Sequence, residues 1–291
     1  MNKKHFLEKI EQAGLVGRGG ADFPVHLKWQ RMLKTEAKQK YVVCNVSEGE
    51  PGVKKDFYIL DTEPEEVFNG FRLSLDFLES KKGYFNFNAD YWQLLQKKLQ
   101  PIIDNFRQQG YELIVFKEKP SYIGGETGSL LNAIEGKRVE PRLKPPSPSL
   151  AGINGAPVLL HNVETLYNVS LVAKEKYENM RFYTVGGRAE KPGVYKLSAK
   201  LTAAEVLRQT NNYPSFNFFA QIGGGASGPI WNQDQLEKNP AAGTGSIEIY
   251  PSDTPAHIIL KQWFKFYMEE SCGKCAPCRQ GTYELYQQIK N

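Results

Sequence analysis

The sequence contains few cysteines, and they are unevenly placed. There are four Cys among 291 residues, and three of them, Cys272, Cys275 and Cys278, fall within the last twenty residues. A small secreted domain held together by disulfides spreads its cysteines through the chain, so that class of protein is excluded.

Targeting signals, long apolar runs and a strong charge excess are also missing. Residues 1–15 contain charged residues but lack the apolar stretch of a secretory signal. The most apolar segment, 157–173, is interrupted by polar residues and falls short of the roughly 18 apolar residues of a membrane span. Lys and Arg total 37 against 32 Asp and Glu without a basic cluster, which disfavours nucleic acid as a partner. We expect a cytoplasmic, thiol-reducing location, with any peripheral association at the inner membrane mediated by a complex.

The chain lacks the common nucleotide-binding and hydrolase motifs. Neither a GxGxxG fingerprint nor a Walker A loop is present, and no nucleophile elbow occurs. The four histidines are scattered and none pairs with a nucleophile, so they are interpreted as solvated or hydrogen-bonding residues: His5, His26, His161 and His257.

The first part of the chain is typical of an α/β domain. Strands are predicted at 41–46, 83–89 and 111–118, with helices at 60–78 and 91–108 between them. This alternation predicts a parallel sheet, in which ligands bind beyond the carboxyl ends of the strands.

The second part changes character. Residues 181–197 predict two short strands around a Gly/Pro turn, followed by a helix at 202–210. An amphipathic helix at 257–271 leads into the cysteines. At this length two or three domains are expected, and we place them at 1–175, 176–252 and 253–291.

A glycine-rich loop at 14–24 is the first candidate ligand site. Bare glycines let backbone N–H groups approach a phosphate or a flat ring, and Arg18 or Lys28 could neutralise its charge. A tight turn without a ligand is the alternative.

An acidic loop follows the first predicted strand. Asn45, Ser47, Glu48 and Glu50 could bind a ribose or a ring edge, or they could be solvated loop residues. Cys44, immediately before them, is interpreted as a small buried apolar residue.

The Cys272-x2-Cys275-x2-Cys278 run is the strongest local signal. Thiolates at this spacing can meet at one point, a pattern of iron–sulfur proteins, with zinc as the competing metal. Only 13 residues follow Cys278, and none is Cys or His, so the fourth ligand is not identified.

Together, these segments resemble the flavin-carrying, NADH-oxidising subunit of respiratory complex I and its relatives in hydrogenases and formate dehydrogenases. Five motifs occur in family order and cover nearly the whole chain, and residues 181–252 are similar to the family's soluble-ligand-binding β-grasp domain. The five motifs are 14–29, 41–52, 124–146, 162–169 and 270–281.

The resemblance implies a Rossmann-like flavin domain, a β-grasp module and a truncated helical iron–sulfur segment. It implies hydride transfer from NADH to FMN, then single electrons to a [4Fe–4S] cluster on Cys272, Cys275 and Cys278, and on to a quinone- or ferredoxin-linked partner subunit. No side chain is expected to be catalytic, since the flavin carries the chemistry, although Glu126 lies nearby. The positions matching the FMN site are Gly17, Arg18, Gly19, Lys28, Asn45, Ser47, Glu48, Gly125, Glu126, Asn162 and Thr165, and those matching the NADH site are Phe23, Glu50 and Lys144.

The chain departs from the family pattern at several of these positions. Ser47 replaces an Asp, Thr127 a Glu and His161 an Asn, while Arg31 and Ser147 occupy positions where Phe is common. The family's fourth cluster Cys would lie some tens of residues beyond Asn291. Two alternatives are a related ferredoxin:NAD-type electron-transfer subunit and a non-catalytic scaffold of the same fold.

Overall fold

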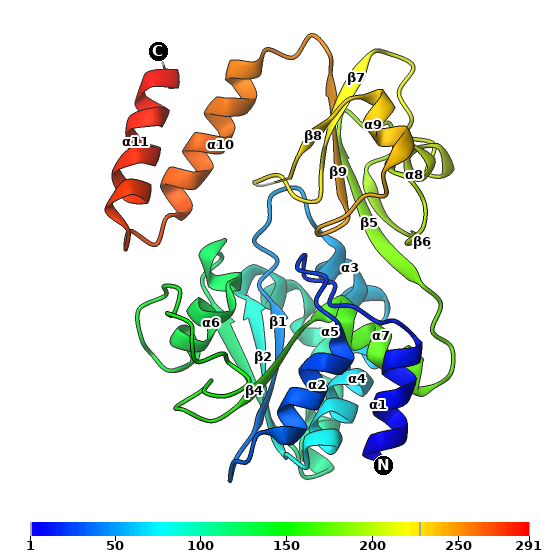
Figure 1. Cartoon of the computed structure of the whole chain (residues 1–291), viewed down its shortest axis with the longest axis vertical. Helices are drawn as coiled ribbons and strands as arrows, with labels where there is room; N and C mark the ends of the chain where they lie inside the picture. Colours follow the sequence, from blue (N-terminus) through cyan, green and yellow to red (C-terminus); the bar gives the residue numbers. More distant parts are fainter. Residues whose placement is uncertain (1, 227, 291) are drawn as a thin grey trace. The chain divides into compact units, whose positions relative to one another are not determined.

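The computed structural model describes residues 2–226 and 228–290. The chain divides into two compact units, each described by itself below (Figure 1). The first comprises Met1–Glu48, Lys54–Pro120 and Gly124–Asn179, and the second comprises Gly49–Val53, Ser121–Ile123 and Met180–Asn291. The domain boundaries proposed at residues 175 and 252 stay predictions.

The first unit is built on a four-stranded parallel sheet, which confirms the predicted fold class. Its strands are β1 (Tyr41–Val46), β2 (Lys82–Asn88), β3 (Glu112–Glu118) and β4 (Val158–Asn162). They lie in the order β3-β2-β1-β4, so the chain proceeds outward from β1 and then returns to its other side. In such sheets the ligand site is at the point where the strand order reverses, which here is the carboxyl end of β1 and β4.

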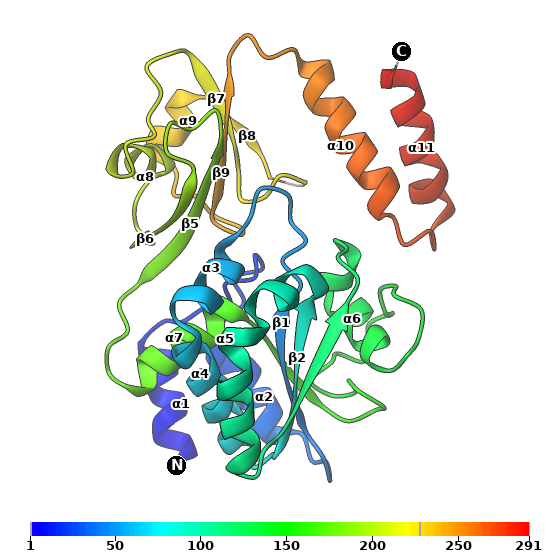
Figure 2. The same ribbon diagram turned by 180° about the vertical axis from the view of Figure 1, so that it is seen from behind.

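Helices cover both faces of this sheet (Figures 1 and 2). On one face, Phe68 of α4 stacks on Phe85 of β2 with ring centroids 4.5 Å apart, and Phe71 packs on the same ring in a tilted arrangement at 4.6 Å. On the other face, Leu130 and Leu131 of α6 pack with Val43 and Val158. The helices of this unit are α1 (Lys3–Gln12), α2 (Val25–Lys34), α3 (Lys55–Thr62), α4 (Pro64–Leu78), α5 (Ala89–Gln108), α6 (Thr127–Ile134) and α7 (Val163–Ala173), and a 3₁₀ turn at Ile123–Gly125 precedes α6.

The structure differs from the prediction in two helical regions. The single helix expected at 60–78 is wrong: α3 ends at Thr62 and α4 begins at Pro64. Proline has no N–H to donate within a helix and its fixed φ suits the first helical position, so it starts the second helix. The basic segment around Lys28, for which no helix was predicted, forms α2, and Trp29 is fully buried.

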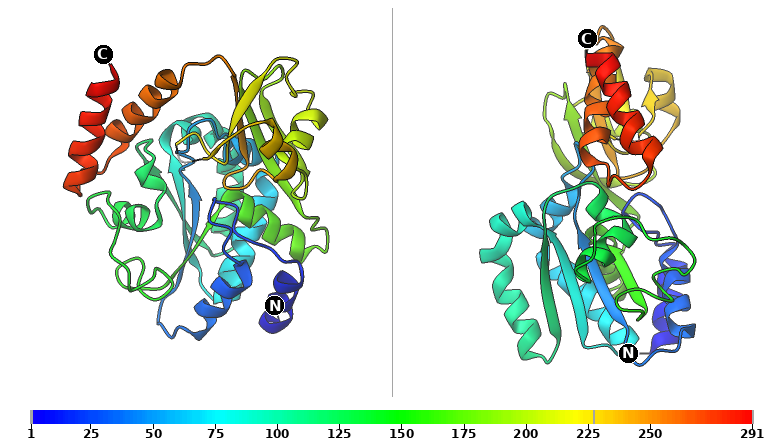
Figure 3. Two further views of the ribbon diagram at one scale, coloured as in Figure 1. Left: turned by 45° about the horizontal axis from the view of Figure 1, so that its top comes forward. Right: turned by 90° about the vertical axis from the view of Figure 1, so that its left-hand side faces the viewer.

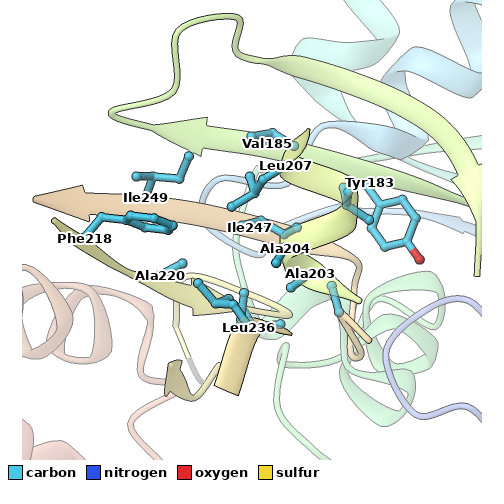
Figure 4. Close-up of a cluster of buried hydrophobic side chains, with 13 residues drawn as sticks. Tyr183, Val185, Ala203, Ala204, Leu207, Phe218, Ala220, Leu236, Ile247 and Ile249 are labelled. Carbon is cyan, nitrogen blue, oxygen red and sulfur yellow. The ribbon is translucent and has the colours of Figure 1, made fainter. Parts of the chain in front are cut away.

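The second unit contains a mixed five-stranded sheet of the kind expected for a β-grasp module. Its order is β6-β5-β9-β7-β8, with β5 and β9 parallel and the other pairs antiparallel. Helix α8 packs Ala203, Ala204 and Leu207 against the apolar side chains of the sheet (Figure 4). The elements are β5 (Met180–Gly187), β6 (Gly193–Ser198), α8 (Ala203–Gln209), β7 (Phe218–Ile222), β8 (Ile230–Trp231), α9 (Gln233–Lys238) and β9 (Ser246–Pro251).

Two C-terminal helices complete the second unit. α10 (Ala256–Glu270) and α11 (Ala276–Lys290) fold back on each other through the cysteine segment (Figure 3). Ile259 is the one buried residue of α10, and α11 buries none of its described residues. Within residues 2–226 and 228–290, no helix is both long and apolar enough to cross a bilayer.

Candidate functional site

Two asparagines mark the carboxyl ends of the central strands. Asn45 of β1 lies opposite Asn162 of β4 in the parallel register. Asn45 Nδ2 donates to the Gly125 carbonyl at 3.0 Å, and its Oδ1 accepts from the Ser47 N–H at 3.0 Å. Asn162 caps α7, because its Oδ1 accepts the Glu164 N–H at 2.9 Å. Both side chains are half-buried, and both are held in place at the point where the strand order reverses.

The glycine loop lies against the same strand end. The Arg18 N–H donates to Thr165 Oγ1 at 2.9 Å, which joins the loop to the first turn of α7. A Cβ atom added to Gly19 would lie 3.4 Å from the Asn162 Cβ. The Arg18 side chain is buried, and its Nη2 donates to Asn179 Oδ1 at 3.0 Å. The predicted flavin residues of this loop are therefore brought together with those of β4 and α7.

A buried group of charges lies beside Asn162. Lys55 Nζ is 2.7 Å from Asp56 Oδ1 and 3.2 Å from Glu164 Oε2, and all three residues are at most 3% exposed. Asn162 joins this group because it accepts from Lys55 Nζ at 3.3 Å and donates to Asp56 Oδ2 at 2.5 Å. These charged residues were not among the predicted site residues, although Lys55 and Asp56 follow the acidic loop directly in the sequence.

The charges of this group alter the pKa values within it. Burial lowers the pKa of Lys55, but the carboxylates of Asp56, Glu164 and Glu48 raise it by more, so the ammonium stays charged. For Glu48, desolvation and the Asp56 carboxylate raise the pKa, against the opposing effect of Lys55. Glu48 Oε1 and Oε2 accept the N–H groups of Asp56 and Phe57 at 2.7 and 3.1 Å. The acidic loop is thus fixed to the first turn of α3 rather than solvated.

Ser47 lies in a second polar group at the ends of β2 and β3. The Ser47 side chain is buried, and its Oγ accepts from Asn86 Nδ2 at 3.0 Å. Burial raises the pKa of the neighbouring Glu118, while the polar side chains of Ser47 and Asn86 lower it in part. A Cβ added to Gly125 would lie 3.3 Å from the Ser47 Cβ. Asn86 and Glu118 were also missed, and the signal that could have found them is their place at strand carboxyl ends.

A pocket of about 200 Å³ opens in the first unit between α2, the N-terminus of α6, residues 144–149 and β4. Its apolar lining is Phe23, Pro148, Val158 and Leu160. Its polar lining is Lys28, Arg31, Thr127, Lys144, Ser147 and Ser149. We call this the cationic pocket. It brings together Phe23, Lys28 and Lys144, three of the residues predicted to bind cofactors.

The lysines of the cationic pocket differ in burial. Lys28 Nζ donates to the Leu160 carbonyl at 3.0 Å, and burial lowers its pKa to about 8. Lys144 is exposed and its Nζ lies 3.5 Å from Glu126 Oε1. Glu126 also caps α6, because its Oε2 accepts the Ser129 N–H at 2.9 Å. Lys28 is therefore fixed in position, whereas Lys144 forms an exposed ion pair with Glu126.

Glu50 belongs to the second unit, where its Oε1 accepts the Ala226 N–H at 2.8 Å. Phe23 and Lys144, the other residues assigned to NADH, belong to the first unit.

The three C-terminal cysteines are not brought together. Cys272 is half-buried, and Cys275 and Cys278 are exposed, with Cys278 in the first turn of α11. In the part of the chain that the structure describes, no three His, Cys, Asp or Glu side chains converge as metal ligands. The convergence of three thiols that the spacing predicts is not seen among these described residues, and the role of the cysteines as cluster ligands stays a prediction. Cys44 is fully buried, as predicted.

The fold is that of a doubly wound α/β protein, with a group of polar side chains at the point where the strand order reverses. The Nuo51 FMN-binding domain family matches residues 10–171, more than half of the chain, and the iron–sulfur binding region of NADH-ubiquinone oxidoreductase-F matches residues 258–291. The chain belongs to this Nuo51 FMN-binding family, which confirms the resemblance seen in its motifs.

Several known proteins are similar over most of this chain. An NADH-quinone oxidoreductase subunit of Rhizobium meliloti is 29% identical over 94% of this chain and 73% of its own length. An NADH-quinone oxidoreductase subunit of Buchnera aphidicola is 31% identical over 94% of this chain and 69% of its own. The alpha subunit of the NAD-reducing hydrogenase HoxS of Cupriavidus necator is 29% identical over the whole of this chain and 52% of its own.

A solved structure supports the same architecture. The air-oxidised NAD⁺-reducing [NiFe]-hydrogenase has a chain that aligns with 99% of this one at a TM-score of 0.91 and 26% identity. The present chain spans about half of that hydrogenase chain, 54% of its length.

Proposed function

We propose that this chain is the electron-input subunit of a larger complex, in which it oxidises NADH with bound FMN. The observation that carries the proposal is the convergence of Asn45, Asn162 and the glycine loop at the carboxyl ends of β1 and β4. When bound, FMN supplies the chemistry of accepting a hydride and releasing electrons singly. The chain's own residues bind and orient the ring and keep it from water.

The residues at this site suit a flavin mononucleotide. The amides of Asn45 and Asn162 are held by their own hydrogen bonds, yet each Nδ2 carries a second hydrogen for a ring edge. The absence of side chains at Gly19 and Gly125 allows the backbone to approach Asn162 and Ser47 closely, so that these glycine segments and the two polar side chains can contact the same ligand. We propose that the FMN-binding set is Gly17, Arg18, Gly19, Lys28, Asn45, Ser47, Glu48, Gly125, Glu126, Asn162 and Thr165.

The dinucleotide is assigned to the cationic pocket. Phe23, which is 40% exposed, offers an aromatic ring, and the exposed Lys144 supplies positive charge. We propose that Phe23 and Lys144 contact NADH there and that Glu50 is a third contact. This proposal rests on the pocket lining for the first two residues and on the sequence motif for Glu50.

Flavin binding is tested with the full chain reconstituted with FMN under anaerobic conditions. We expect one FMN per chain, and bleaching of the flavin absorbance when NADH is added. Asn45→Leu should weaken FMN binding about tenfold or more, because one or more hydrogen bonds are lost. Asn105→Leu, at an exposed position of α5, should leave it unchanged. A chain that binds no FMN contradicts the proposal, and a bound flavin that NADH does not bleach favours the non-catalytic scaffold.

The cysteine segment is proposed to contribute three thiolates to a [4Fe–4S] cluster. Support comes from the match of residues 258–291 to an iron–sulfur binding region, and the separated thiols provide no geometry from which to derive an electron step. Iron and acid-labile sulfide are counted after anaerobic reconstitution. We expect Cys275→Ser to lose most of the iron and the buried Cys44→Ala to retain it. Equal iron contents in the two variants would refute the assignment.

The proposed partners are electron-transfer subunits that carry further iron–sulfur clusters, and a quinone- or ferredoxin-linked acceptor follows them. The similar proteins support this, since they are subunits of NADH-quinone oxidoreductases and of an NAD-reducing hydrogenase. Any membrane attachment is proposed to occur through these partners.

A further inference from the structure

We propose that the cationic pocket, besides accepting NADH, binds more tightly a dinucleotide with an additional phosphate on its adenosine ribose, as in NADPH, and that Arg31 is the residue that confers this preference. The inference rests on the proposed function, because it takes the pocket to hold a dinucleotide. The preference for the additional ribose phosphate is not stated in the names of the similar proteins.

The charge of the pocket is the first argument. Lys28, Arg31 and Lys144 line it, and none of its lining residues is Asp or Glu. Glu126, outside the lining, offsets Lys144 in part at 3.5 Å. Two positive charges therefore remain for an anion. A phosphate monoester adds a charge of about −1.5 to −2 to the ligand, which this excess would neutralise.

Arg31 is available for this contact. It follows Lys28 by three residues on α2, so both side chains lie on the same helix face. Among the described residues, no carboxylate lies within ion-pair distance of the exposed Arg31 guanidinium. A guanidinium presents a planar fork of donors that matches phosphate oxygens, and Arg is the residue that accommodates a ribose 2′-phosphate in dinucleotide-binding folds.

Hydroxyl groups add further donors beside these cations. Ser147 Oγ and Ser149 Oγ lie 3.0 Å apart, and Ser149 is only 7% exposed. Thr127 lines the same pocket at the start of α6. Lys28 uses one of its three ammonium donors on the Leu160 carbonyl, which leaves two for a ligand.

The apolar lining distinguishes a nucleotide from a simple anion. Phe23, Val158 and Leu160 offer a surface on which a base can stack, next to the cations. The lining has one aromatic side chain, Phe23, next to its polar donors. A phosphorylated nucleoside contacts both the apolar lining and the cations, whereas inorganic phosphate contacts only the cations.

The test compares two adenosine fragments by isothermal titration calorimetry on the FMN-reconstituted full chain. Adenosine 2′,5′-bisphosphate should bind about tenfold to a hundredfold more tightly than 5′-AMP, as expected for hydrogen bonds to a charged group. Arg31→Gln should remove most of this difference, and Arg31→Lys should retain part of it. Lys34→Gln is the matched control, since Lys34 is an exposed cation on the same helix outside the pocket.

Several outcomes overturn the inference. Equal affinity for the two fragments, binding of neither, or displacement of the bisphosphate by an equal concentration of inorganic phosphate would each do so. If Arg31→Gln retains the difference in affinity between the two fragments, Arg31 does not confer the preference. Circular dichroism melts confirm that each variant is folded.

The failure of this inference is distinguishable from failure of the proposed function. Flavin bleaching by NADH without a preference for the bisphosphate would retain the function and reject the inference. Preference for the bisphosphate without bleaching by NADH or NADPH would retain the nucleotide site and reject the electron-input role.

Discussion

The buried charge group of the first unit and the C-terminal helix pair differ in how far the fold buries their polar side chains. Lys55, Asp56 and Glu164 are at most 3% exposed and are bonded to one another across more than 100 residues of sequence. α11, which carries Cys278, buries none of its described residues. The side chains of the buried charge group are fixed by the chain's own packing, whereas the described side chains of α11 are not buried by it. A clear sequence motif therefore does not by itself imply an assembled site.

The most damaging change should be removal of the one cation in the buried charge group. Lys55→Met leaves the carboxylates of Asp56 and Glu164 buried without their counter-charge. We expect the free energy of unfolding to fall by about 3 to 5 kcal/mol. Urea unfolding followed by circular dichroism measures the change.

The matched control is Lys265→Met in α10. Lys265 pairs with Glu269 at 3.8 Å, but both side chains are 56% exposed, so its loss should cost less than about 1 kcal/mol. Equal losses in the two variants would show that burial does not distinguish the two regions.

A second large effect is expected at Gly70, within α4. A Cβ added there would lie 1.9 Å from the Leu166 carbonyl oxygen of α7, so the two helices must move apart. Gly70→Ala should lower the free energy of unfolding by about 3 kcal/mol, the upper part of the usual range for overpacking. Glu65→Ala, at an exposed position of the same helix, should change it little. An unchanged urea midpoint for Gly70→Ala would contradict this close packing.

The sequence predicts the parts of the site that follow from local patterns. The β-branched strand 41–46, the glycine loop and the position of Asn45 after a buried strand all indicate the observed place of the site. Lys55, Asp56 and Glu118 escaped prediction because charged residues are normally exposed, and only tertiary packing makes them buried.

Other features of the structure were not predicted from the sequence, for different physical reasons. The break at Pro64 was predictable from the missing N–H of proline, whereas the side-chain positions of the cysteines depend on packing that α11 does not supply. The unit that contains Glu50 could not be assigned from the sequence, because its loop crosses from one unit to the other.

A moderate pH effect should come from His161, which is 2% exposed and accepts the Trp29 Nε1–H at 2.8 Å on its Nε2. Burial and the nearby Lys28 lower the pKa of His161 well below its usual value. The unfolded chain then binds a proton that the folded chain does not. Stability is therefore present above about pH 6.5 and is lost as the pH falls below it, by about 2 kcal/mol at pH 5.

This dependence is measured by urea unfolding at pH 7, 6 and 5. His161→Asn should flatten the slope between pH 6.5 and 5, and His257→Gln, at an exposed position of α10, should retain it. A His161→Asn variant with the full slope would assign the effect to other groups.

The smallest effect, and one of opposite sign, should occur at Gly281 in α11. Nothing lies within 4 Å of an added Cβ, in contrast to Gly70, although both glycines are inside helices. Gly281→Ala should stabilise α11 by up to about 1 kcal/mol, because alanine restricts the unfolded backbone more than glycine does. Slower amide hydrogen exchange in residues 282–286, with an unchanged urea midpoint for the first unit, is the expected result. If Gly281→Ala instead destabilises α11, a close contact forms at this position. The helix would then be as constrained as α4, and the contrast between the two regions would be lost.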